Sequence, residues 1–109
     1  MNDFIPAAVR PSVLVVDDTP QNLQLISDLL APRYRVRVAP SGDRALQIAQ
    51  ATPPDLILLD VLMPEPDGYE VCRRLKARAR TRDIPVIFLT SRHDMENEAL
   101  GFSLGAVDY

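Results

Sequence analysis

The sequence predicts a single α/β domain in which helices cover both faces of a parallel sheet. Strand-like and helix-like segments alternate along its 109 residues. The inner strand segments are continuously apolar, as in strands that are buried on both sides of a sheet. Because crossovers between parallel strands are right-handed, few topologies remain. We expect a doubly wound sheet with the strand order 2-1-3-4-5.

The N-terminal part of the chain is expected to form a leader, a strand and a helix. Residues 1–11 are assigned to the leader, and residues 12–109 to the domain. The run "SVLVVD" over 12–17 is typical of a buried strand. Thr19 offers a capping hydroxyl to a helix expected over 20–31, which begins with a proline. Its apolar residues recur at helical spacing: Leu23, Ile26, Leu29 and Leu30.

The middle of the chain is expected to contain two more strands and two more helices. The run "YRVRVA" over 34–39 alternates apolar residues with arginine, which indicates a strand near a sheet edge. Ser41 caps the next helix, and "DLILLD" over 55–60 is another buried strand. Asp67 opens a third helix that extends through about Ala79. The residues expected to be buried on these helices are Ala45, Ile48, Ala49, Val71, Cys72 and Leu75.

The last part of the chain is expected to continue the same alternation. The run "IPVIFLT" over 84–90 predicts a fourth strand, and a fourth helix follows over 94–104. Gly105 ends that helix at the position where glycine is favoured. The final residues, "AVDY" over 106–109, begin a fifth strand.

The composition excludes several classes of protein. Hydrophobic residues make up 47% of the chain and charged residues 25%, as in ordinary globular domains. A single cysteine, Cys72, excludes an intramolecular disulfide and gives no support for secretion. No apolar run approaches the ~18 residues of a membrane span, and a net charge of −3 does not favour nucleic acid. We therefore expect a cytoplasmic domain that binds neither membranes nor nucleic acid directly.

Acidic side chains follow the first and third strands, which are neighbours in the expected sheet. Ligands of doubly wound sheets bind beyond the carboxyl ends of the strands, where the winding reverses. Asp17 and Asp18 follow the first strand, Asp60 ends the third, and Thr90 ends the fourth. Three carboxylates that meet in one crevice repel each other, so either one keeps a proton or a cation lies among them. A hard divalent ion prefers such oxygen ligands, and the residues therefore indicate Mg²⁺ together with phosphate.

Four motifs, in order and at consistent spacing, resemble the receiver domain of bacterial two-component response regulators, a flavodoxin-like fold. They are "VLVVDD", "DLILLDVLMPEPDGYEVC", "IPVIFLT" and "LGAVDY", and the resemblance covers residues 12–109. It implies a domain that accepts a phosphoryl group from the histidine of a sensor kinase or phosphotransfer protein. The domain then switches conformation to control an attached or partner output. Apart from assisting its own phosphorylation, such a domain is not an enzyme.

The resemblance also implies roles for the acidic residues. Asp60 would be the phosphoacceptor. Asp18 and Asp60 would bind Mg²⁺ directly with the backbone carbonyl of Leu62, and Asp17 would hold a metal-bound water. These roles agree with the chemistry, because phosphoryl transfer to a carboxylate mainly requires positioning and charge neutralisation.

Further roles concern the phosphoryl contact and the switch. Thr90 would donate its hydroxyl to the phosphoryl oxygens, and Tyr109 would be the aromatic that rotates inward as Thr90 moves. Pro64 and Gly68 would shape the loop over the site. An aspartyl phosphate adds nearly two negative charges, which can reorder the flanking loops.

The sequence departs from the family pattern at its end. The family normally carries a lysine three residues beyond the aromatic aligned with Tyr109, and here the chain ends first. The only lysine, Lys76, is expected to face solvent far from the crevice, within a basic run from Arg73 to Arg82. We therefore expect an incomplete receiver that lacks the end of the fifth strand and the fifth helix. It should bind Mg²⁺, accept phosphate poorly and self-associate through its uncovered first helix.

Two other functions remain as alternatives. A degenerate receiver that serves only as a docking module would be consistent with the missing lysine. A Mg²⁺-dependent phosphohydrolase would use Asp60 or Asp17 as a nucleophile, but haloacid-dehalogenase-like enzymes need Asp-x-Asp where this chain has Asp-Asp. For the parent protein, the wording of the motifs resembles receivers joined to cyclic-di-GMP enzymes or to sensor kinases.

Overall fold

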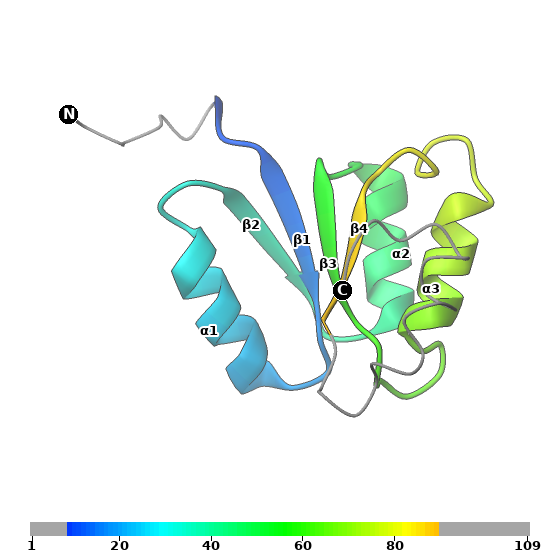
Figure 1. Ribbon diagram of the computed structural model, residues 1–109, viewed down its shortest axis with the longest axis horizontal. Coiled ribbons are helices and arrows are strands. Elements are labelled where there is room, and N and C mark those ends of the chain that lie inside the picture. The colour runs from blue at the N-terminus through cyan, green and yellow to red at the C-terminus, as the bar shows by residue number, and fades with distance from the viewer. Residues whose placement is uncertain (1–8, 90–109) are drawn as a thin grey trace.

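A four-stranded parallel sheet forms the centre of the computed structural model, which describes residues 9–89 (Figure 1). The strands lie in the order β2-β1-β3-β4, which confirms the first four positions of the predicted order. The expected fourth helix and fifth strand lie outside the described residues. The elements are β1 (Ser12–Val16), α1 (Pro20–Leu30), β2 (Arg35–Ala39), α2 (Gly42–Ala51), β3 (Leu56–Asp60), α3 (Gly68–Lys76) and β4 (Val86–Leu89).

The register of the strands brings the ends of β1 and β3 to the same edge of the sheet. Val16, the last residue of β1, lies between Ala39 of β2 and Leu59 of β3. The residues that immediately follow Val16 and Leu59 in the chain therefore emerge side by side. This alignment places Asp17 and Asp60 at one edge, as the sequence predicts.

The sheet separates two hydrophobic cores. Val13 and Val15 face α1, whereas Leu14 and Val16 face α2 and α3 on the opposite side (Figure 1). Full burial of one such aliphatic side chain contributes about 1.5–3 kcal/mol to folding. Of the six residues predicted to be buried on α2 and α3, five are buried and the sixth, Ile48, is half-buried. On α1, however, Leu29 is 70% exposed, so the expected apolar face is narrower than predicted.

Two of the three predicted helix caps form. The Ser41 hydroxyl accepts a hydrogen bond from the Arg44 amide at 3.2 Å, and the Asp67 carboxylate accepts one from the Glu70 amide at 2.9 Å. Thr19 occupies the N-cap position of α1, but its hydroxyl makes no capping bond, contrary to the prediction. Its backbone amide donates to Asp17 instead, so the start of α1 is tied to the end of β1.

The third helix ends earlier than predicted, at Lys76 rather than at about Ala79. The Lys76 ammonium donates to the carbonyls of Arg82 and Ile84 at 3.1 and 2.6 Å. The buried Thr81 hydroxyl donates to the Leu75 carbonyl at 2.7 Å. The Thr81 bond satisfies a carbonyl group that the end of α3 leaves open, and the Lys76 bonds tie the turns that follow back to the helix. Lys76 is therefore half-buried and bonded, and the expectation that it faces solvent is wrong.

Several other element ends differ from the predictions by one or two residues. β1 ends at Val16, α1 at Leu30, and β4 begins at Val86. β2 and β3 each begin one residue later than expected, at Arg35 and Leu56. Between residues 9 and 89, no helix is both long and apolar enough to cross a membrane.

Candidate metal centre at the carboxyl edge of the sheet

Three carboxylates meet at the carboxyl edge of β1 and β3. One oxygen from each of Asp17, Asp18 and Asp60 lies within 4.8 Å of the other two. The structure therefore brings together the three acidic residues that the sequence predicts. Thr90 and Tyr109, the other two predicted site residues with side-chain roles, lie outside the described residues.

Asp17 is the most deeply placed of the three. Its side chain is buried, with 5% of the residue exposed. One carboxylate oxygen accepts a hydrogen bond from the Thr19 amide at 2.9 Å, and the other accepts one from the Asn22 side-chain amide at 3.2 Å. These donors fix the carboxylate and help to offset the cost of burying its charge.

Sequence reasoning missed Asn22. The residue belongs to the first turn of α1, and the expected apolar stripe of that helix does not include it. Its only signal is its place two residues after Pro20, in the helix turn that directly follows the acidic pair. The Asn22 amide thus orients the Asp17 carboxylate within the cluster, and groups that orient the residues of a metal site influence its affinity.

Asp60 has an unusual electrostatic environment. Burial, followed by the negative charge of Asp17, raises the pKa of Asp60 from 3.8 to about 6. Asp18 adds to the rise, whereas a hydrogen bond from the Leu62 amide, 3.2 Å from the Asp60 carboxylate, opposes it. No arginine or lysine within residues 9–89 contributes to this shift. Among the described residues, the site therefore holds more negative charge than its neighbours neutralise.

Close packing at Gly68 fixes the backbone around Asp60. The Gly68 amide donates to the Val61 carbonyl at 3.1 Å. A Cβ atom at this position would collide with the carbonyl oxygen of Asp60 and with the Cα of Val61. Only glycine lets α3 begin so close to the end of β3, which agrees with the predicted role of Gly68 in shaping the loop.

The donor set fits a magnesium ion. All three side chains offer hard oxygen ligands, one is buried and held, and the excess negative charge would be relieved by a divalent cation. Leu62 lies two residues beyond Asp60, and its backbone amide already contacts the Asp60 carboxylate. The Leu62 carbonyl, the fourth oxygen ligand that the family resemblance implies, belongs to the same loop.

Comparison with known proteins gives consistent matches along the chain. The sequence model of the response regulator receiver domain matches residues 13–109. A probable cyclic di-GMP phosphodiesterase of Vibrio cholerae is 51% identical over 98 residues, which are 90% of this chain and 22% of that protein. The N-terminal domain of a response regulator receiver protein from Methanoculleus marisnigri has a TM-score of 0.83 at 40% identity, covering 91% of this chain and 81% of that one.

A third match is to a metal-bound structure. The Mn²⁺-bound form of response regulator Rcp1 has a TM-score of 0.81 at 26% identity, covering 91% of this chain and 78% of that one. The chain spans less than half the length of the curated relatives that it matches. The matched family, the parallel sheet and the cluster of three carboxylates agree with one another. The chain belongs to the response regulator receiver family.

Proposed function

We propose that Asp60 is the phosphoacceptor of this receiver domain. The observation that carries the proposal is its place among the three carboxylates. Asp17 is buried and accepts hydrogen bonds on both oxygens, so it is poorly placed to attack phosphorus. Asp60 is half-buried at the end of β3, where its carboxylate stays accessible while the Leu62 amide and Gly68 hold its position.

The transfer itself needs little covalent chemistry from the protein. A carboxylate oxygen of Asp60 forms a bond to phosphorus while the phosphorus–nitrogen bond of the donor phosphohistidine breaks. The histidine nitrogen keeps the electron pair of that bond. The protein contributes by orienting the Asp60 carboxylate, which accepts a hydrogen bond from the Leu62 amide at 3.2 Å.

We further propose Mg²⁺ as the cofactor. Asp18, Asp60 and the Leu62 carbonyl would hold it directly, and Asp17 would hold one of its waters. When bound, the ion neutralises the negative charge that builds up among the carboxylates and the phosphoryl oxygens. The support within this chain is the meeting of three carboxylates within 4.8 Å of one another. Burial, and then the charges of Asp17 and Asp18, raise the pKa of Asp60 there.

The remaining parts of the proposal rest on the family resemblance. The donor would be a sensor histidine kinase or a phosphotransfer protein in the cytoplasm, and the domain would act as a switch rather than as an enzyme. Thr90 would contact the phosphoryl group, and Tyr109 would respond to it. The similarity to a probable cyclic di-GMP phosphodiesterase supports an output in the parent protein that involves this nucleotide.

Phosphorylation by a small acyl-phosphate donor in the presence of Mg²⁺ tests the function. Intact mass spectrometry should show one added phosphoryl group on the wild type, and none on Asp60→Asn or after chelation of the metal. Asp43→Asn, which changes an exposed acid on α2, is the matched control and should label normally. If the wild type binds Mg²⁺ but never labels, a phosphorylation-independent docking module replaces the switch.

A further inference from the structure

The outer edge of β2 has no strand partner within residues 9–89. The Arg35 amide donates to the Pro11 carbonyl, and the Ala39 carbonyl accepts from the Asp17 amide. In a parallel ladder, alternate residues direct their backbone groups to the same neighbour. Arg35, Arg37 and Ala39 thus face β1, so Val36 and Val38 direct their N–H and C=O groups outward. This open edge is a template for another strand.

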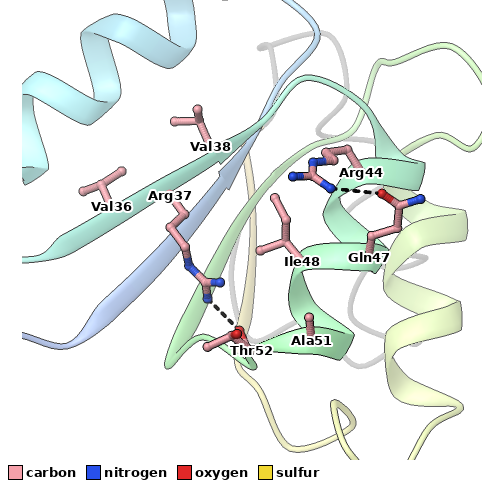
Figure 2. Close-up of a pocket in the computed structure, with 8 residues that line it drawn as sticks. All are labelled: Val36, Arg37, Val38, Arg44, Gln47, Ile48, Ala51 and Thr52. Atoms are coloured by element: carbon pink, nitrogen blue, oxygen red, sulfur yellow. Dashed lines mark hydrogen bonds between the residues drawn. The ribbon is translucent and has the colours of Figure 1, made fainter.

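One side of the β2 edge is a basic groove. A cavity of about 540 Å³ lies between β2 and α2, and its lining includes Arg37 and Arg44 but no acidic residue (Figure 2). The Arg37 guanidinium is held in place by the Thr52 carbonyl at 2.6 Å, and Arg44 lies beside Gln47 at 3.2 Å. Within residues 9–89, the side-chain bonds of both arginines go to uncharged groups, so their charges can attract an acidic group.

On the other side of the same edge, toward α1, lies a smaller cavity with a mainly apolar lining. Figure 2 shows the Val36 and Val38 side chains directed away from the groove that holds Arg37. This second cavity, of about 250 Å³, is lined by Val38 together with Pro20, Leu23, Gln24 and Ser27 of α1. Val38 itself is 41% exposed. The two faces of the edge therefore differ in charge: the cavity toward α2 has two arginines beside apolar groups, whereas the cavity toward α1 is lined by no charged residue.

We propose that the β2 edge binds an extended acidic peptide segment of a partner protein as an added strand. Side chains of a strand alternate between the two faces of a sheet. The segment would therefore place acidic residues toward Arg37 and Arg44, and apolar residues toward Val38 and α1. Backbone bonds would form with Val36 and Val38, as in other cases of strand addition. A second copy of this chain is a poorer occupant, because its own β2 edge would bring Arg35 and Arg37 against like charges.

A peptide titration tests the proposal. The probe is a fluorescent seven-residue peptide with blocked ends that alternates valine and glutamate, and its control replaces glutamate with lysine. Fluorescence anisotropy should detect binding of the glutamate peptide only, and added salt should weaken it. Arg44→Glu should weaken binding at least tenfold. The matched control Arg82→Glu makes the same charge change at an exposed position beyond α3 and should leave binding unchanged.

A proline substitution tests the backbone contacts. The Val38 amide points outward, so Val38→Pro removes an edge donor without removing a bond to β1. Binding should weaken at least tenfold in this variant while its thermal melting shows a folded domain. Failure of the glutamate peptide to bind would overturn the proposal, as would equal binding of the lysine peptide or indifference to both Arg44→Glu and Val38→Pro. Dimers that disappear in Val38→Pro would assign the edge to a second copy and also overturn it.

Discussion

The three carboxylates at the edge of the sheet have different environments. Asp17 is buried and accepts two hydrogen bonds, Asp18 is exposed, and Asp60 is half-buried with a pKa raised to about 6. The difference follows from the chain: Asp17 adjoins the start of α1, whereas Asp60 adjoins the loop before α3. One residue is thus suited to hold the site and another to react.

Asn22 should contribute to metal affinity through Asp17. Its side-chain amide is one of the two groups that orient the Asp17 carboxylate. Replacing a group that orients a residue of a metal site typically costs 10–100-fold in affinity. We expect Asn22→Ala to weaken Mg²⁺ binding about tenfold, measured by calorimetric titration. Gln24→Ala changes an exposed amide on the same helix and is the control. Equal affinities in the two variants would remove Asn22 from the site.

At the level of elements, the junction of β3 and α3 determines the geometry around Asp60. Gly68→Ala places a methyl group against the Asp60 carbonyl, so either α3 or the strand end must move. Overpacking of this kind costs about 1–3 kcal/mol of unfolding free energy. We expect that loss in chemical denaturation, together with weaker Mg²⁺ binding by the folded variant. Cys72→Ala, a buried change on the same helix, should lower stability but retain Mg²⁺ affinity. If Gly68→Ala binds Mg²⁺ normally, the junction does not position Asp60.

The elements also show what the sequence can and cannot predict. The order of the sheet and the meeting of Asp17 with Asp60 were predictable, because continuously apolar strands and right-handed crossovers leave few arrangements. The end of α3 was not predictable, because it depends on hydrogen bonds from Lys76 and Thr81 to carbonyl groups several residues away in the chain. A pattern of apolar residues does not reveal such bonds. The missing cap at Thr19 has a similar cause. Its amide binds Asp17, a tertiary contact that local propensity does not include.

The basic run after α3 illustrates the same limit. Its expected role was a solvated outer face, and most of its side chains are exposed. Arg80, however, donates to the carbonyls of Gln50 and Ala51 at 2.6 and 3.2 Å, which closes the end of α2. Arg73 and Arg74 pair with Glu70 and lower its pKa to about 2. Composition alone does not show which cations carry such contacts.

For the whole molecule, the raised pKa of Asp60 predicts a particular dependence of stability on pH. The folded-state pKa of about 6 lies above the ordinary value of 3.8, so between these values the folded state binds more protons. Without metal, the free energy of unfolding should therefore fall as pH rises from about 4 to about 7. Because solvent screens a half-buried group, the effect should be on the order of 1 kcal/mol.

Asp60→Asn isolates this contribution from those of the other acids. In thermal melts without metal, the variant should gain stability relative to the wild type as pH rises through about 6. Saturating Mg²⁺ should restore the wild type at pH 7, because the ion binds only the folded site. A difference between wild type and variant that does not change with pH would contradict the electrostatic account of the site.

The outer surface of α1 predicts self-association. Leu25 and Leu29 are 59% and 70% exposed, and they lie one turn apart on the same helix. Exposed apolar groups of this size favour contact between molecules. Sedimentation velocity should detect dimers at high concentration that the double change Leu25→Glu and Leu29→Glu removes. The control Leu62→Glu changes a leucine that is 61% exposed but lies after β3, away from α1, and the dimers should persist in this variant. A wild type that remains monomeric would show that this surface is too small to associate.

The most direct measurement identifies which carboxylate carries the phosphoryl group. After phosphorylation in Mg²⁺, borohydride reduces an aspartyl phosphate to homoserine, and peptide mass spectrometry then locates the changed residue among Asp17, Asp18 and Asp60. The buried, doubly bonded Asp17 and the half-buried Asp60 predict modification at Asp60 alone. Homoserine at Asp17 or Asp18 instead would contradict the assignment of roles within the cluster.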